Sequence, residues 1–298
     1  MEILEIKKAT DDNTVKFIYL TEDGLIAEAS YINKNDGKDI ICIPCQTACQ
    51  MKCKFCHVTD VADKLITRNL RAEEMADCVN ILFKKLDLQA NHRCLLVSFM
   101  GCGEPLCNSI NIGDCMTALV AMHSDRLVRF GIATSLPKGH WHNFFNLAAK
   151  IKERKLLVKM HLSLHYTNDA LRAHWMPNAL EILPAISALE FYQKLTGNSV
   201  EIHYALIEGL NDTEQDAILL TEMLQGRGIP VKFLFYNEKP SVDYHASSKK
   251  AVATFAKHFD PKGVKHEYYI PPGISIAASC GMLLMDYYVK YSKNKINF

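Results

Sequence analysis

Short apolar runs alternate with longer amphipathic stretches along most of the chain, beginning near residue 39. The short runs are rich in β-branched and aromatic residues and predict strands at 40–44, 94–100, 130–134, 157–165, 200–206, 231–236 and 266–270. The longer stretches repeat apolar residues with helical spacing and predict helices at 72–86, 112–123, 142–154, 178–195, 212–226 and 247–259. Strands separated by helices of this length form right-handed βαβ units, so we expect a parallel sheet.

The first segment of the chain, 1–38, has a different pattern. Short apolar segments alternate there with polar turns, and Asp23-Gly24 is typical of a hairpin turn. We expect a small N-terminal β-hairpin extension over 1–38, followed by a main domain over 39–298. About six βα units are too many for a small open sheet and too few for a full barrel of eight. The predicted fold is therefore α/β, a partial open (β/α)6 barrel with its functional site at the carboxyl ends of the strands.

Charge and cysteine usage narrow the functional classes. The formal net charge is +1, so no global basic field favours nucleic acid, and an RNA contact would need a local patch such as 150–159. Met1 is followed by Glu2 and Glu5 rather than by a basic and then an apolar stretch, so we expect no signal peptide, no membrane contact and a cytoplasmic location. The chain has 11 cysteines, an odd number, and they are clustered, which favours metal ligation or thiol chemistry over a disulfide framework.

One loop directly after the first barrel strand holds four of these thiols. The last three, Cys49, Cys53 and Cys56, have the spacing C-x3-C-x2-C. Three thiolates can bind three irons of a four-iron cluster and leave the fourth iron open to another ligand. The alternative is a structural zinc site completed by Cys45 or His57, although zinc sites prefer two separated ligand pairs.

The cysteine spacing, with Phe55 before the last cysteine, resembles the radical S-adenosylmethionine (SAM) superfamily. That resemblance implies a [4Fe-4S] cluster whose open iron chelates SAM, cleavage of SAM to a 5′-deoxyadenosyl radical, and a partial barrel. Further stretches at the predicted strand ends are MGCGEPLCN (100–108), Thr134-Ser135, Ser163-Leu164-His165, Asn237 and IAASCG (276–281). Together they resemble the radical-SAM RNA adenine methyltransferases that methylate 23S rRNA, over about residues 14–288.

The resemblance assigns SAM contacts to residues at these strand ends: Gly103, Glu104, Ser135, Ser163, Leu164, His165 and Asn237. The residue types fit this role, because a carboxylate beside a flexible glycine can bind an ammonium group and neutral side chains can bind a carboxylate, a ribose and an adenine. Each of these residues, taken alone, could equally be a satisfied polar cap at the end of a strand.

The same resemblance implies a methyl relay through two cysteines. Adenine C2 is electron-poor and offers no nucleophile, so direct methyl transfer from SAM fails there. In the relay, Cys280 takes a methyl group from one SAM, and a radical from a second SAM removes a hydrogen from it so that the carbon adds to the ring. Glu28 corresponds to the base that removes the ring proton, and Cys42 to the thiol that releases the product as a disulfide. Structurally, Cys42 could instead be a core thiol and Cys280 part of a tight helix start.

Two departures from the family bear on the substrate. Met1 falls just before the family's hairpin, so we expect the N-terminal helical accessory domain to be missing, and an arginine-and-glycine-rich approach to Cys280 is replaced by YIPPGI (269–274). The expected activity is methylation of an adenine in rRNA or tRNA, with C2 preferred over C8, by a monomer that uses a reducing electron donor such as flavodoxin or ferredoxin. The alternatives are a radical-SAM enzyme acting on a free nucleotide or small heteroaromatic, and a non-catalytic iron–sulfur or zinc binding module.

Overall fold

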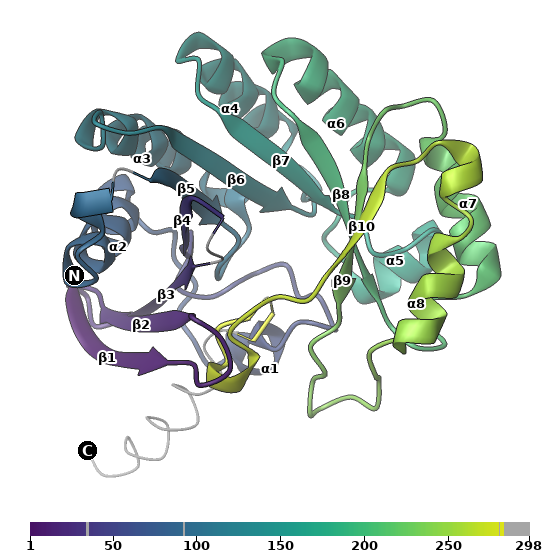
Figure 1. The fold of residues 1–298 in the computed structure, drawn as a ribbon, viewed down its shortest axis with the longest axis horizontal. Coiled ribbons are helices and arrows are strands. Elements are labelled where there is room, and N and C mark those ends of the chain that lie inside the picture. The colour runs from purple at the N-terminus through teal and green to yellow at the C-terminus, as the bar shows by residue number, and fades with distance from the viewer. Residues whose placement is uncertain (34–35, 92, 280, 283–298) are drawn as a thin grey trace.

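A computed structural model of the chain describes residues 1–33, 36–91, 93–279 and 281–282. Its strands form a single sheet whose order follows the chain from β1 to β10 (Figure 1). The strands are β1 (Glu2–Lys8), β2 (Val15–Leu20), β3 (Ile26–Asn33), β4 (Lys38–Cys42), β5 (Cys94–Phe99), β6 (Val128–Thr134), β7 (Val158–Ser163), β8 (Val200–Leu206), β9 (Val231–Phe235) and β10 (His266–Tyr269).

The parallel part of the sheet runs from β4 to β10, as the alternating pattern predicts. Six long helices connect these strands: α2 (Ala72–Lys85), α3 (Ser109–Met122), α4 (Trp141–Glu153), α6 (Ile182–Thr196), α7 (Glu214–Leu224) and α8 (Lys249–Ala256). The sheet curves and the helices cover its outer face, so the inner face lines an incomplete barrel (Figure 1). The prediction of a partial (β/α)6 barrel is confirmed.

The N-terminal strands extend this sheet. The hairpin of β2 and β3 turns at Asp23-Gly24, where Gly24 has φ 78°, and β1 adds a further antiparallel strand that the pattern does not predict. Strand β3 pairs antiparallel with β4 through Ser30 and Cys42. The hairpin therefore continues the barrel wall.

Two short helices were not predicted, α1 (Val58–Ala62) and α5 (Asp169–Trp175). Both are shorter than the window of about 11 residues over which helical periodicity can be recognised in a sequence. The predicted strand 157–165 ends early, at Ser163, because His165 has a φ of 59° and cannot continue an extended strand. The predicted helix 178–195 begins only at Ile182, after a turn held by α5.

The two faces of the sheet differ in character. Apolar side chains on the outer face pack against the helices, and on the hairpin Phe17 and Tyr19 lie on this side, where the Tyr19 hydroxyl donates to the Cys78 carbonyl of α2 at 3.1 Å. The alternate residues of β2, including Lys16, must face the barrel interior. Among the described residues, no helix is both long and apolar enough to cross a membrane.

Candidate active site

The cysteine loop lies at the carboxyl end of β4, between that strand and α1. Cys49, Cys53 and Cys56 are close enough for their charges to act on one another, and burial raises the pKa of Cys49 to about 12 and that of Cys53 well above its usual range. The three cysteines are half-buried, and thiolates that repel each other in such a setting are stabilised by a cation between them, so this donor set fits an iron–sulfur cluster. His57 is buried and its Nε2–H donates to the Asn237 carbonyl at 3.2 Å, which engages that ring nitrogen.

Strand β5, the second of the parallel strands, is followed by a turn that contains Gly103-Glu104-Pro105, here called the GEP turn. Gly103 has a φ of 107°, and a Cβ there would lie 2.7 Å from Gln46 and 2.8 Å from the Cys45 sulfur, so only glycine fits. The Glu104 carboxylate accepts hydrogen bonds from the Thr134 hydroxyl (2.5 Å), the Leu106 amide (3.1 Å), the Ser135 amide (3.0 Å) and the Ser135 hydroxyl (2.9 Å). Burial nevertheless raises its pKa above the usual value.

These hydrogen bonds occupy about four acceptor positions, the capacity of a carboxylate. An ammonium ligand at Glu104 must therefore displace a donor, and the hydroxyls of Thr134 and Ser135 can rotate away about a single bond. The displaced Ser135 hydroxyl would then be available to a carboxylate on the same ligand. The arrangement therefore suits a ligand that carries an α-ammonium and an α-carboxylate group, as an amino acid does.

Strand β7 ends at Ser163, and the turn after it holds Leu164 and His165. The His165 Nδ1 accepts from the Ala205 amide at 3.0 Å, so its proton is on Nε2. Burial lowers the pKa of His165 to about 3, which keeps the imidazole neutral. Its ring meets Phe55 of the cysteine loop edge to face, with centroids 5.1 Å apart. The turn after β7 therefore contacts the cysteine loop that follows β4.

One buried cation at this edge was missed in the sequence analysis. Arg172, from α5, is 1% exposed, and its guanidinium donates to the carbonyls of Leu180 (2.8 Å), Ser163 (2.9 Å), Leu164 and Ser135 (3.0 Å). It therefore joins the ends of β6 and β7, the strands that carry the predicted SAM contacts. An arginine in a short polar segment gives no sequence signal, because only the fold shows that it is buried.

The inner face of the hairpin brings Glu28 and Cys42 together. Ser30 is the register partner of both Lys16 and Cys42, and Cys42 is the partner of Ser98, so these residues share one face. Glu28 lies two residues from Ser30, on the same face and toward the carboxyl end of β4, which makes it a diagonal neighbour of Cys42. Glu28 is 0% exposed and forms a buried ion pair with Lys16 at 2.8 Å.

The segment after β10 returns to the mouth of the barrel. Cys280 itself lies outside the described residues, but both of its neighbours are described. The Ser279 hydroxyl accepts from the Asn237 side chain at 2.9 Å. The Gly281 carbonyl accepts from the His57 amide at 2.9 Å and lies 3.8 Å from the Cys56 sulfur. Residues on both sides of Cys280 therefore contact the end of β9 or the cysteine loop.

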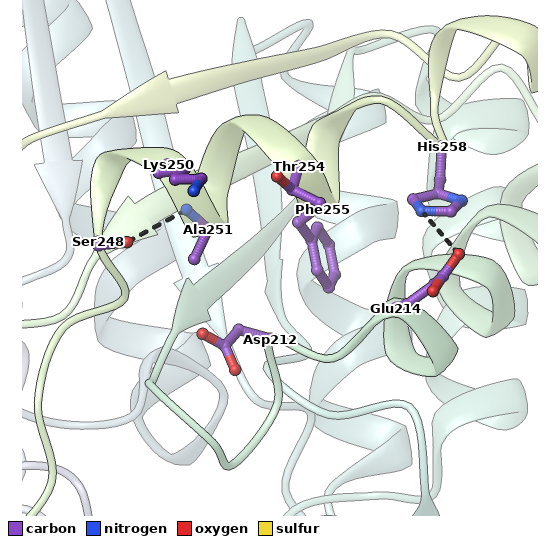
Figure 2. Close-up of a pocket in the computed structure, with 8 residues that line it drawn as sticks. All are labelled: Asp212, Glu214, Ser248, Lys250, Ala251, Thr254, Phe255 and His258. Carbon is purple, nitrogen blue, oxygen red and sulfur yellow. Dashed lines mark hydrogen bonds and ion pairs between the residues drawn. The ribbon is translucent and has the colours of Figure 1, made fainter.

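Two other groupings of polar residues contain none of the predicted site residues, although the first adjoins the end of β7 through His203, the register partner of Ser163. His161, Glu201 and His203 come together inside the barrel, but Lys159 and Lys232 also bind Glu201 at 2.5 and 3.0 Å, and these ammonium groups oppose a metal cation there. Figure 2 shows a pocket of about 310 Å³ between α7 and α8, lined by Asp212, Glu214, Ser248, Lys250, Ala251, Thr254, Phe255 and His258. None of the predicted site residues lines it.

Comparison with known proteins identifies the family. No family model matches the chain. A protein of Clostridium perfringens (strain SM101 / Type A) described as "Probable dual-specificity RNA methyltransferase RlmN" is 30% identical over 291 residues, which cover 96% of this chain and 79% of the relative. One of Microcystis aeruginosa with the same description is 29% identical over 283 residues, covering 94% and 80%.

The fold leads to the same family. The crystal structure of a radical SAM methyltransferase from Sphaerobacter thermophilus superposes with a TM-score of 0.82 at 25% identity, covering 94% of this chain and 80% of that one. The partial barrel predicted from the alternation of strands and helices, and the cofactors implied by the resemblance to the radical-SAM superfamily, are thereby confirmed. The chain belongs to the RlmN-type family of radical SAM RNA methyltransferases, whose cofactors are a [4Fe-4S] cluster and SAM.

Proposed function

We propose that this protein methylates an adenine in RNA, at C2 rather than C8, through a methyl group carried by Cys280. The observation that carries the proposal is the meeting of three distant segments at one end of the barrel. The cysteine loop, the inner face with Glu28 and Cys42, and the residues on both sides of Cys280 all lie there.

The strand ends would hold the cofactors. Cys49, Cys53 and Cys56 would bind the cluster, and Glu104 with Ser135 would bind the amino and carboxylate groups of SAM. Ser163, Leu164, His165 and Asn237 would contact the rest of SAM. Bound together, the cluster and SAM would supply the methyl group and the 5′-deoxyadenosyl radical.

Three side chains would then carry the chemistry of the relay. The Cys280 sulfur takes the methyl group and later links it to the adenine ring. Glu28 accepts the ring proton as a general base. After the ring proton leaves, the unpaired electron of the adduct would return to the oxidised cluster, which leaves a closed-shell thioether between Cys280 and the ring. The Cys42 thiolate attacks the Cys280 sulfur, so a disulfide forms as the carbon–sulfur bond breaks, and the released carbon takes the bonding pair and a proton to become the methyl group. An external dithiol then reduces the disulfide and restores both cysteines. An electron donor such as flavodoxin or ferredoxin would reduce the cluster of the monomeric enzyme.

RNA is favoured over a free nucleotide by the relatives' descriptions and by local charge. Lys52, Lys54 and Lys64 are exposed in or beside the cysteine loop, where they can bind phosphates around an adenine swung out of its stack. The basic run 150–159 is less suited, because it joins α4 to β7 at the opposite, amino-terminal edge of the strands. The RNA is an rRNA or a tRNA.

Nucleoside analysis tests the proposal. RNA from cells with and without the gene is digested and analysed by mass spectrometry, and the purified protein is analysed for a methyl group on Cys280. We expect 2-methyladenosine only in cells with the gene, and a methylated Cys280 in protein with an intact cluster. If 8-methyladenosine appears instead, the ring carbon is wrong. If neither nucleoside appears, and the purified enzyme forms 5′-deoxyadenosine when it is incubated with mononucleotides, the proposal of an RNA substrate is wrong.

A further inference from the structure

The segment that carries Cys280 is attached to the N-terminal hairpin by three polar contacts. The Asp12 carboxylate accepts from the Gly273 amide at 2.7 Å, Asp11 accepts from the Ser275 hydroxyl at 2.5 Å, and Lys16 donates to the Ala277 carbonyl at 3.0 Å. In Figure 1 the yellow segment after β10 runs to the turn between β1 and β2, which closes the open side of the barrel.

Lys16 differs from the two aspartates because it is completely buried. Its side chain is 0% exposed, as is that of Glu28, and the Lys16 ammonium lies 2.8 Å from the Glu28 carboxylate and 3.0 Å from the Ala277 carbonyl. A buried ammonium is tolerated only when its protons are bound by acceptors and its charge is balanced. The Ala277 carbonyl is thus one of the groups that keep this cation in the interior.

The position of Ala277 makes the contact relevant to Cys280. Ala277 is three residues before Cys280 in the chain and has a φ of 50°, a left-handed conformation that a residue with a Cβ rarely adopts without support. The Ala278 amide closes the turn by donating to the Gly273 carbonyl at 2.8 Å. The turn from 273 to 278 is therefore compact and is fixed to the barrel wall at its end nearest Cys280.

We propose that Lys16 is a positioning residue that couples the segment carrying Cys280 to the general base Glu28, through simultaneous bonds to the Ala277 carbonyl and the Glu28 carboxylate. The proposal rests on the proposed function, since it assumes that Cys280 carries the methyl group. One buried ammonium then sets the position of two reacting groups relative to each other. Its own role is to hold these two groups in place, and it carries no step of the proposed chemistry.

Hydrogen exchange tests the contact without any use of activity. The amides of Ile276, Ala277 and Ala278 donate within the turn, so their exchange reports its opening. Lys16→Met should speed their exchange on the order of tenfold or more, the size of effect expected from one charged hydrogen bond. Lys152→Met, an exposed lysine on α4, is the control and should leave these amides unchanged.

Because Lys16→Met leaves Glu28 buried without its cation, it can unfold the protein, so a second comparison uses variants without that carboxylate. The variants Glu28→Gln and Lys16→Met/Glu28→Gln have the same neutral residue at 28, and they differ in the Lys16 ammonium and its bond to the Ala277 carbonyl. In the single variant the side-chain oxygen of the glutamine at position 28 still offers an acceptor to Lys16, and near-ultraviolet circular dichroism checks that both variants keep the native packing before their exchange is compared. We expect slow exchange at 276–278 in the single variant and fast exchange in the double variant. Equal exchange in the two overturns the proposal.

Methylation of Cys280 supplies the functional reading. Peptide mass spectrometry of protein purified with an intact cluster should show at least tenfold less methyl-Cys280 in the double variant than in Glu28→Gln, because Glu28 acts only on the adenine. Equal methylation in these two variants overturns the positioning role. If the unaltered protein shows no methyl-Cys280 while exchange still differs between the two variants, the proposed function fails and the Lys16 contact stands.

Discussion

Replacing Arg172 with methionine should destabilise the protein by about 3 kcal/mol. The guanidinium donates to four backbone carbonyls, those of Leu180, Ser163, Leu164 and Ser135. A buried acceptor that loses its donor costs about 1 to 3 kcal/mol. The low end, about 1 kcal/mol, applies to a carbonyl oxygen, because its second lone pair can accept another hydrogen bond. Four of them give about 4 kcal/mol, and the methionine recovers about 1 kcal/mol because it needs no desolvation.

The same change should weaken SAM binding, because Ser135 and the turn at 163–165 lose their common anchor. The free energy of unfolding is measured by urea titration, and the dissociation constant of SAM by equilibrium dialysis of the cluster-loaded protein. Arg172→Lys keeps the charge but not the planar fork, so it should lose about half as much stability. Arg154→Met, at an exposed surface ion pair, is the control and should change stability by less than about 0.5 kcal/mol.

A loss of less than about 1 kcal/mol in Arg172→Met would refute this reasoning. It would mean that water or a rearranged backbone satisfies the four carbonyls, and that the arginine does not hold β6 and β7 together. A large loss of stability with unchanged SAM affinity would keep the structural role and remove the link to the cofactor site.

Three further outcomes can be measured. Cys53→Ser should lose most of the iron and the brown colour of the cluster while Cys78→Ser keeps both, because Cys53 belongs to the proposed ligand set and Cys78 does not; equal iron in the two would contradict the cluster assignment. Gly103→Ala should reduce SAM affinity at least tenfold, because a Cβ meets Gln46 and Cys45 at under 3.0 Å; wild-type affinity would show that the turn adapts. The free energy of unfolding should fall by about 2 kcal/mol between pH 6.5 and 5.5. Burial lowers the pKa values of His161 and His165 to about 3, so in this pH range only the unfolded state takes up protons at these two residues. An unchanged urea midpoint would contradict this prediction.

Much of the barrel was predictable because its local and global signals agree. Each parallel strand is a short apolar run and each long helix carries an apolar stripe, so periodicity alone separates them. The elements that escaped prediction are those whose conformation comes from tertiary contacts. Strand β7 ends where His165 adopts a left-handed conformation, with its ring bound to the Ala205 amide of β8. Helix α5 is short and is held by the bonds of Arg172 to other strands.

The candidate site likewise has a part that was predictable from the sequence and a part that was not. The cysteine triad lies within one loop, so its spacing is readable in the chain, and the GEP turn is marked by a glycine that the backbone requires. The relation between Glu28 and Cys42 depends on the register of β3 against β4, which a shift by one residue would reverse. Sequence spacing cannot supply that register.

Local spacing and strand direction were enough to give the candidate residue types, the number of βα units and the end of the barrel at which the candidate residues lie. The burial of Lys16 against Glu28 and Ala277, and the bonds by which Arg172 joins two strand ends, become visible only in the folded protein. A charged side chain has the same appearance in a sequence whether it is solvated or buried. Its environment is set by segments far away in the chain, and that is information that no local pattern contains.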